Sequence, residues 1–194
     1  MQENQFYSML FRMKYINRWG LMRNVRTENI AEHSLDVAFI AHALGIIKNK
    51  RYGGNIDCEH LALLAMYHDC SEIITGDLPT PVKYYSNDIK SAYKQVESVA
   101  KEVMLSYLPS DIREEYEKLF YKKENEEYLW RLVKAADRIS ALIKCIEEKR
   151  MGNKDFEKAE ESILTSINEI DLPEVQCFMK EFIPAFTLTL DEQA

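Results

Sequence analysis

An almost uninterrupted apolar segment, LALLAMYHDC, runs from Leu61 to Cys70 and carries an imidazole and a carboxylate side by side, His68 and Asp69. A helix this apolar is expected to lie near the centre of the protein. An ionised carboxylate at the end of a buried helix is costly unless a cation or several hydrogen-bond donors compensate it. A divalent metal ion would bind both groups, since it accepts imidazole nitrogen and carboxylate oxygen as ligands. The alternative is a helix-terminal ion pair with a hydrogen-bonded histidine.

Helical periodicity continues through most of the 194-residue chain, which contains six Gly and five Pro. This balance favours helices with short connections. Asn29 and Glu32 form an Asn-based capping box, which predicts where one long helix begins. Because no segment alternates apolar and polar residues for long enough to build a sheet, we expect an all-α fold. The expected architecture is a compact helical bundle with a single domain over residues 1–194. The spacing predicts helices over residues 5–15, 30–49, 58–70, 86–107, 128–150 and 155–169, and shorter ones from Pro109 and Pro173.

The composition argues against several classes of protein. A formal net charge of −7 is opposite to the basic surface that binds nucleic acid polymers. The four cysteines show no CxxC spacing, which is typical of reduced thiols in an intracellular protein. No signal-peptide pattern and no apolar run of membrane-spanning length is evident in the sequence, so we expect a cytoplasmic protein with no membrane partner.

Two further residues with ligand chemistry stand on other predicted helices. His33 lies in the first turns of helix 30–49. Asp137 interrupts the buried stripe of helix 128–150, where a carboxylate again requires a cation. Two imidazoles and two carboxylates suit a divalent ion such as Mn²⁺, Co²⁺, Zn²⁺, Fe²⁺ or Ni²⁺. The candidate metal ligands are His33, His68, Asp69 and Asp137.

An Arg–Trp pair and a proline-rich loop are candidates for substrate contacts. Arg18 offers a guanidinium fork for phosphate, and the adjacent Trp19 offers a flat apolar plate, which together suit a nucleotide pocket. The loop GDLPTP, residues 76–81, contains two prolines that restrict its backbone. Such a stiff loop can preorganise contacts to a substrate, although a plain connector is the alternative.

Other polar features are interpreted without a functional role. His42 sits on a largely apolar helix, where a histidine is usually structural. His60 has no acidic partner at ligand spacing and is expected to be structural or exposed. The charged run KKENEE, residues 122–127, is expected to be a surface connection.

The order His…His-Asp…Asp is the signature of the HD phosphohydrolase superfamily. Three segments of this sequence also closely resemble the bacterial HD-domain 5′-deoxynucleotidases, and the similarity covers nearly the whole chain. The resemblance implies a helical, metal-dependent, cytoplasmic homodimer that dephosphorylates deoxyribonucleoside 5′-monophosphates and disfavours ribonucleotides. It also implies a metal-binding core over about residues 28–147. The three segments are NRWGLMRNVRTENIAEHS, ALLAMYHDCSEIITGDLPTPVKY and VKAADRISALIKCIEE.

The same resemblance implies a role for each matching residue. It implies one divalent ion, Co²⁺, Mn²⁺, Zn²⁺ or similar, on the four candidate ligands, and a catalytic role for Glu72 and Arg18. No histidine follows His68, so a second metal of the kind that uses further histidines is not expected. The implied substrate contacts are Arg18, Trp19, His33, Asp69, Asp77, Leu78, Pro79, Thr80 and Asp137.

Two alternatives stay open at this point. Other HD proteins hydrolyse cyclic dinucleotides, dinucleoside polyphosphates or deoxynucleoside triphosphates. From a different class, the chain could be a catalytically silent nucleotide-sensing protein with a vestigial metal site. The presence of Glu72 together with all four candidate ligands argues against decay of the site.

Overall fold

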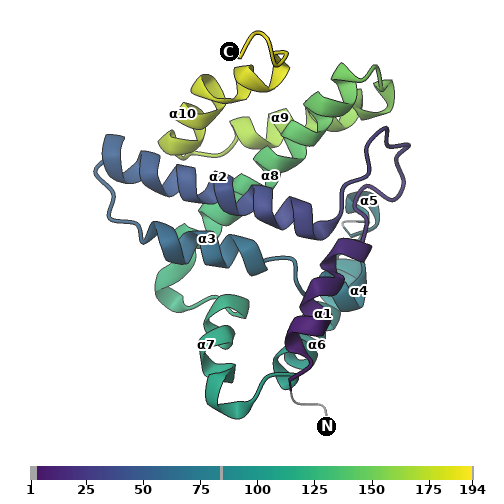
Figure 1. The fold of residues 1–194 in the computed structure, drawn as a ribbon, viewed down its shortest axis with the longest axis vertical. Coiled ribbons are helices and arrows are strands. Elements are labelled where there is room, and N and C mark those ends of the chain that lie inside the picture. Colours follow the sequence, from purple (N-terminus) through teal and green to yellow (C-terminus); the bar gives the residue numbers. More distant parts are fainter. Residues whose placement is uncertain (1–3, 84, 194) are drawn as a thin grey trace. The chain divides into compact units, whose positions relative to one another are not determined.

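The computed structural model describes residues 4–83 and 85–193, and these residues form helices joined by turns and by a longer irregular segment over residues 16–29 (Figure 1). Within these two ranges the only strand-like pairing is an isolated antiparallel bridge between Asn17 and Asn29. The all-α prediction is therefore confirmed. The chain divides into two compact units, and the expectation of a single domain stays a prediction. The first unit comprises Met1–Leu21, Thr27–Ser34 and Tyr67–Glu124, and the second comprises Met22–Arg26, Leu35–Met66 and Asn125–Ala194.

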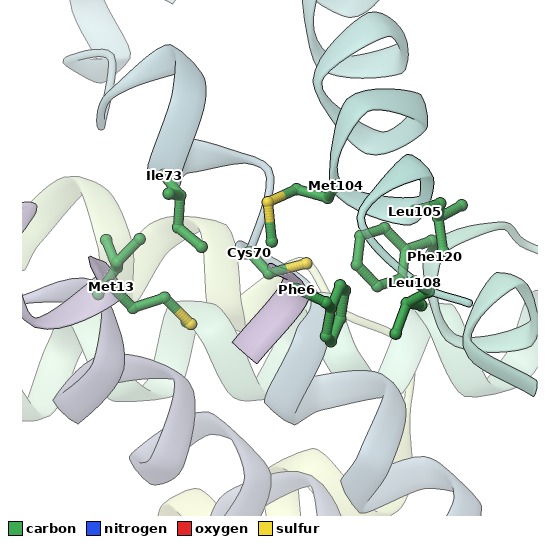
Figure 2. Packing of buried hydrophobic residues seen from close by; sticks show 9 residues of the cluster. Phe6, Met13, Cys70, Ile73, Met104, Leu105, Leu108 and Phe120 are labelled. Carbon is green, nitrogen blue, oxygen red and sulfur yellow. The ribbon is translucent and has the colours of Figure 1, made fainter. Parts of the chain in front are cut away.

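The first unit is built around a buried apolar cluster (Figure 2). Phe6, Met104 and Leu105 are fully buried in it. Cys70 and Ile73 also belong to the cluster, so apolar packing anchors the turn that carries His68 and Asp69 and the short helix that begins at Glu72. The remaining members are Met13, Ile30, Leu108 and Phe120. The unit contains α1 (Phe6–Leu10), the 3₁₀ helix η1 (Phe11–Tyr15), α4 (Glu72–Thr75), α5 (Thr80–Lys83), α6 (Asn87–Ser106) and α7 (Ser110–Phe120).

The second unit is built on the long helix α8 (Glu127–Arg150), which packs against α9 (Glu157–Asn168). Figure 1 shows these two helices side by side. Helix α2 (Ile30–Arg51) belongs to this unit from Leu35 onward. Its Gly45 allows a close approach to the start of α3 (Cys58–Tyr67), because an added Cβ would lie 3.0 Å from Cys58 Sγ. The other elements are η2 (Glu124–Glu126), η3 (Lys154–Phe156), α10 (Pro173–Glu181) and η4 (Ile183–Thr187).

The predicted capping box is present at the start of α2. The Asn29 side-chain oxygen accepts the backbone N–H groups of Ala31 and Glu32, at 3.0 and 3.1 Å. The Glu32 carboxylate in turn accepts the backbone N–H of Asn29 at 3.4 Å. These bonds satisfy amides that the first helical turn leaves without partners, so the helix begins at Ile30. His33 thereby lies in a fixed first turn.

Two expectations about helix boundaries were wrong. The apolar helix ends at Tyr67 instead of running to Cys70, so His68 and Asp69 lie in a turn before the short helix α4. In that turn Cys70 N–H donates to Tyr67 O and Glu72 N–H donates to Asp69 O, at 3.2 and 2.9 Å. The segment 5–15 is not one helix, because its second half winds as the 3₁₀ helix η1.

Helix α2 is apolar over most of its length. It is long and apolar enough to cross a membrane, contrary to the sequence expectation, but 56% of its most apolar window is buried inside the protein. Burial of this kind is typical of the core helix of a soluble protein.

Candidate active site

Three of the four predicted metal ligands converge in the first unit. His33 comes from the first turns of α2, whereas His68 and Asp69 come from the turn after α3. Their candidate ligand atoms all lie within 4.8 Å of one another. Asp69 Oδ2 is 3.5 Å from Nε2 of His33 and 3.1 Å from Nε2 of His68. A capped helix start and a core-anchored turn therefore bring two distant segments together.

The charge of Asp69 persists despite its burial. Burial alone would raise the pKa of this carboxyl, but the imidazoles of His68 and His33 bring it below the ordinary range for an aspartate. The guanidinium of Arg18 acts in the same direction. The result is an ionised carboxylate between two imidazole nitrogens, which is a donor set that fits a divalent ion such as Zn²⁺, Co²⁺ or Mn²⁺. The fourth predicted ligand, Asp137, is a half-buried residue of α8 in the second unit, and its role stays a prediction.

Arg18 lies directly beside this cluster. Its Nη1 is 2.8 Å from Nδ1 of His33 and donates to Oε2 of Glu28 at 2.7 Å. The backbone supports this placement, because Arg18 N–H donates to Glu28 O at 2.9 Å and Ile30 N–H donates to Ile16 O at 3.0 Å. Two extended strips of chain therefore run side by side before α2 begins. The pairing of these two segments fixes the positively charged Arg18 guanidinium next to the candidate metal ligands.

Trp19 is held by its side chain and by its backbone. Its indole Nε1–H donates to Glu28 Oε2 at 2.9 Å, and its backbone N–H donates to the Asp77 carboxylate. Trp19 has φ of +61°, in the left-handed region that residues other than glycine rarely adopt. Such a conformation costs on the order of 1 kcal/mol or more and persists only where surrounding contacts enforce it. The structure thus brings the two predicted sugar-binding residues, Trp19 and Asp77, into contact.

Glu72 is a buried carboxyl with an unusual pKa. Burial raises its pKa to about 9, and the charges of Asp69 and Asp77 add to the effect, whereas Lys83 and Arg18 oppose it. Its Oε2 has no hydrogen-bond partner among the described residues. The raised pKa favours the protonated form of the carboxyl, which makes Glu72 a potential proton donor. Burial raises the pKa of Asp77 as well, and Arg18 is the largest opposing influence.

The loop after α4 leads from Asp77 into a short helix. Gly76, with φ of +72°, provides the backbone conformation that starts the loop. The Pro79 carbonyl accepts the N–H groups of Val82 and Lys83, so Thr80–Lys83 winds as α5 and only part of the predicted loop is irregular. Leu78 and Pro79 are half-buried and Thr80 is exposed.

Sequence reasoning missed two residues of this site, Glu28 and Lys83. Glu28 is 8% exposed and accepts from two predicted substrate residues. It belongs to no helix, and the resemblance assigned it no role although it lies inside one of the three matching segments. Lys83 donates to Glu97 at 2.9 Å and lies over the ring of Tyr93, 4.6 Å from its centroid. The signal that could have drawn attention to Lys83 was its place two residues after the proline-rich loop.

The two histidines outside the cluster differ from each other. His42 is exposed on α2. His60 pairs with Glu126, with Nε2 and Oε1 2.9 Å apart, and Glu126 is 6% exposed. The expectation that residues 122–127 form only a charged surface connection was therefore wrong at Glu126. Sequence spacing could not show this pair, because the two residues are far apart in the chain.

Comparison with known proteins agrees with the geometry. The family model described as 5′-deoxynucleotidase YfbR-like matches residues 5–186. The chain belongs to this family. Within the YfbR-like group, a 5′-deoxynucleotidase of Vibrio vulnificus (strain YJ016) is 48% identical over 192 residues, which is 99% of each chain. A 5′-deoxynucleotidase of Yersinia pseudotuberculosis (strain IP32953) is 48% identical over 189 residues, covering 97% of this chain and 96% of that one. The predicted resemblance is therefore confirmed.

Solved structures support the YfbR-like assignment at the level of the fold. An HD-domain phosphohydrolase from Listeria innocua superposes with a TM-score of 0.81 at 25% identity, covering 97% of this chain and 91% of that one. The cyanophage S-2L HD phosphohydrolase DatZ, solved with dA and one catalytic Zn²⁺ ion, has a TM-score of 0.64 at 19% identity, with 94% and 96% covered.

Proposed function

We propose that this protein is a metal-dependent phosphomonoesterase that hydrolyses deoxyribonucleoside 5′-monophosphates to a deoxynucleoside and phosphate. The observation that carries the proposal is the convergence of His33, His68 and Asp69 beside the Arg18 guanidinium. Membership of the YfbR-like family and the 5′-deoxynucleotidase relatives support the substrate class.

A phosphomonoester is an anion at neutral pH and repels an attacking hydroxide. One divalent ion, held by His33, His68, Asp69 and Asp137, would offset that charge and lower the pKa of the attacking water. The nitrogen and oxygen donors suit Zn²⁺, Co²⁺ or Mn²⁺. The DatZ structure, with its catalytic Zn²⁺, supports a metal of this kind.

Arg18 and Glu72 supply the remaining chemistry. The Arg18 guanidinium binds the non-bridging oxygens and stabilises the charge that spreads over them in the transition state. Water attacks phosphorus, the bond to the 5′-oxygen breaks, and the leaving oxygen takes a proton. A Glu72 carboxyl with a pKa of about 9 is suited to donate that proton. Acceptance of the proton of the attacking water is the alternative role for Glu72.

The sugar is selected by the contact between Trp19 and Asp77. Asp77 accepts the 3′-hydroxyl, Trp19 packs against C2′, and the loop Leu78, Pro79 and Thr80 closes around the sugar. A 2′-hydroxyl would then lose its water against the indole without gaining a partner. An unpaired buried polar group costs about 1–3 kcal/mol, which corresponds to about tenfold to more than a hundredfold in relative rate. The enzyme should therefore disfavour ribonucleotides.

The protein is also proposed to act as a cytoplasmic homodimer. Leu35, Phe39 and Ile46 lie along α2 with exposures of 46%, 65% and 41%, which is unusual for large apolar side chains that share one helix. A second copy of the chain would cover them. Light scattering on the purified protein should give twice the chain mass, and Phe39→Asp should lower it. A monomeric wild-type protein would contradict the proposal.

The function is tested by a phosphate-release screen on protein stripped of metal and then reloaded with one divalent ion. The substrates are 5′- and 3′-monophosphates with and without the 2′-hydroxyl, together with deoxynucleoside triphosphates and dinucleoside polyphosphates. We expect release from deoxyribonucleoside 5′-monophosphates above all others. Preference for a triphosphate or a dinucleoside polyphosphate would favour another HD activity. Binding of nucleotides with no release from any substrate would favour a silent nucleotide sensor.

A further inference from the structure

One carboxylate oxygen of the first unit holds two of the proposed substrate contacts at once. Oε2 of Glu28 accepts Nη1–H of Arg18 at 2.7 Å and Nε1–H of Trp19 at 2.9 Å. The guanidinium carbon of Arg18 lies 5.8 Å from the centroid of the Trp19 ring. Because both donors share one acceptor, neither can move far without disturbing the other.

The surroundings of Glu28 make this arrangement rigid. Its side chain is 10% exposed, and that of Arg18 is 12% exposed. The backbone of Glu28 is paired as well, since its carbonyl accepts the Arg18 N–H. Arg18 Nη1 also lies 2.8 Å from Nδ1 of His33, a candidate metal ligand, whereas Glu28 is not one of the candidate metal ligands. Charge-assisted hydrogen bonds of this kind are stronger than bonds between neutral groups.

We propose that Glu28 is a positioning residue that holds the Arg18 guanidinium and the Trp19 indole in a fixed position relative to each other. The selection of deoxyribose over ribose depends on this relative position. The inference rests on the proposed function, because it assigns the sugar contact to Trp19. Glu28 itself touches no reacting atom and acts through its two donors. The hydrogen bond from the indole Nε1–H to Glu28 also helps to offset the cost of the left-handed backbone conformation at Trp19.

The kinetic test compares two variants of Glu28 with one control. Glu28→Ala removes the acceptor for both donors, and the ratio of kcat/KM for dAMP over AMP should fall by about three- to tenfold, the worth of one hydrogen bond. Glu28→Gln keeps an oxygen that can accept the indole N–H, so it should restore most of the ratio. Glu32→Gln is the control, because Glu32 is a nearby exposed glutamate whose carboxylate caps the Asn29 N–H, and glutamine can serve there too. It should leave the ratio unchanged.

A spectroscopic test follows the indole without any turnover. The chain has two tryptophans, so Trp130→Phe leaves Trp19 as the only indole. Trp130 Nε1 is buried without a hydrogen-bond partner among the described residues, so this background removes no bond. Adding Glu28→Ala should increase acrylamide quenching of Trp19 and lower its fluorescence anisotropy. Adding Glu32→Gln should change neither.

The outcomes separate the two proposals. A wild-type protein that hydrolyses dAMP and AMP equally would contradict the sugar role of Trp19, while the quenching experiment would still report whether Glu28 holds the indole. Unchanged quenching and an unchanged ratio in the Glu28 variants would overturn the positioning role. An equal loss in Glu28→Gln and Glu28→Ala, with normal quenching, would also overturn it, because a charge effect would then explain the loss. If Glu28→Ala does not fold, Glu28→Asp decides, because the shorter side chain keeps the charge but draws the acceptor away from both donors. It should lower the ratio and increase quenching of Trp19, and an unchanged ratio with unchanged quenching would overturn the positioning role.

Discussion

Glu148 of α8 is the buried charge on which we expect the stability of the second unit to depend most. It is fully buried and forms an ion pair with Lys144, which is 3% exposed. Its two oxygens also accept the backbone N–H groups of Val25 and Arg26, at 2.9 and 3.1 Å, and Asn153 Nδ2 at 2.7 Å. Glu148 therefore ties the segment Met22–Arg26, which follows Arg18 and Trp19 in sequence, to the end of α8.

The size of the effect follows from the pKa of this carboxyl. Burial alone would raise the pKa of Glu148, but the Lys144 ammonium and the other donors lower it from 4.5 to about 2. A carboxyl whose pKa is lowered on folding adds stability above its unfolded pKa, and loses it as the pH falls towards the folded pKa. The difference between the folded and unfolded pKa of Glu148 contributes about 3 kcal/mol to the free energy of unfolding at pH 7 and about 1 kcal/mol at pH 3. Glu148→Gln also leaves the Lys144 ammonium buried without its counter-charge, which is strongly destabilising.

Urea unfolding at pH 7 and at pH 3 measures this effect. We expect Glu148→Gln to lower the free energy of unfolding by about 3 kcal/mol at pH 7, and the gap to wild type to narrow by about 2 kcal/mol at pH 3. Glu147→Gln on the same helix is the control, because the Glu147 carboxylate is 40% exposed and lies 4.0 Å from Arg26. A surface change of this kind should stay within about 0.5 kcal/mol at both pH values. A gap that is the same at both pH values, or no larger than that of the control, would refute the reasoning.

Three further predictions concern the site. Asp137→Ala should abolish metal retention and turnover but keep the helical circular dichroism, whereas exposed His42→Ala should retain metal; full metal occupancy in Asp137→Ala would remove it from the ligand set. His60→Ala is a poor control, since it leaves the buried Glu126 carboxylate without its imidazole partner. Glu72→Ala should lose turnover and keep metal content and substrate affinity, and loss of metal would instead make Glu72 a ligand. Trp19→Ala should reduce the dAMP over AMP ratio of kcat/KM by admitting AMP, and an unchanged ratio would mean that another residue senses the 2′ position.

Local sequence signals predicted the helices and the three candidate ligands that lie close together. The Asn29–Glu32 capping box fixed the start of α2 to the residue, because capping depends on neighbours in the chain. His68 and Asp69 were found because two polar residues follow a strongly apolar segment. The turn that carries them was not expected, since the apolar period continues to Cys70 while the helix ends at Tyr67.

The parts that sequence reasoning missed depend on tertiary contacts. Glu28 contacts Arg18 and Trp19 only because the extended segment before α2 pairs with the segment that carries those two residues. The His60–Glu126 pair joins residues far apart in the chain, and no periodicity marks it. The pKa of about 9 for Glu72 arises from burial and from carboxylates that the fold brings near, so composition and spacing could not reveal it.

The most direct test of the proposed function is a metal titration in which bound metal and phosphate release from dAMP are measured on the same samples. Protein stripped with a chelator should release no phosphate, and activity should rise in proportion to bound Co²⁺, Mn²⁺ or Zn²⁺ until one ion is bound per chain. His68→Ala should neither bind the ion nor gain activity. Full phosphate release from the metal-free protein, or an activity that does not follow the bound ion, would contradict a metal-dependent 5′-deoxynucleotidase.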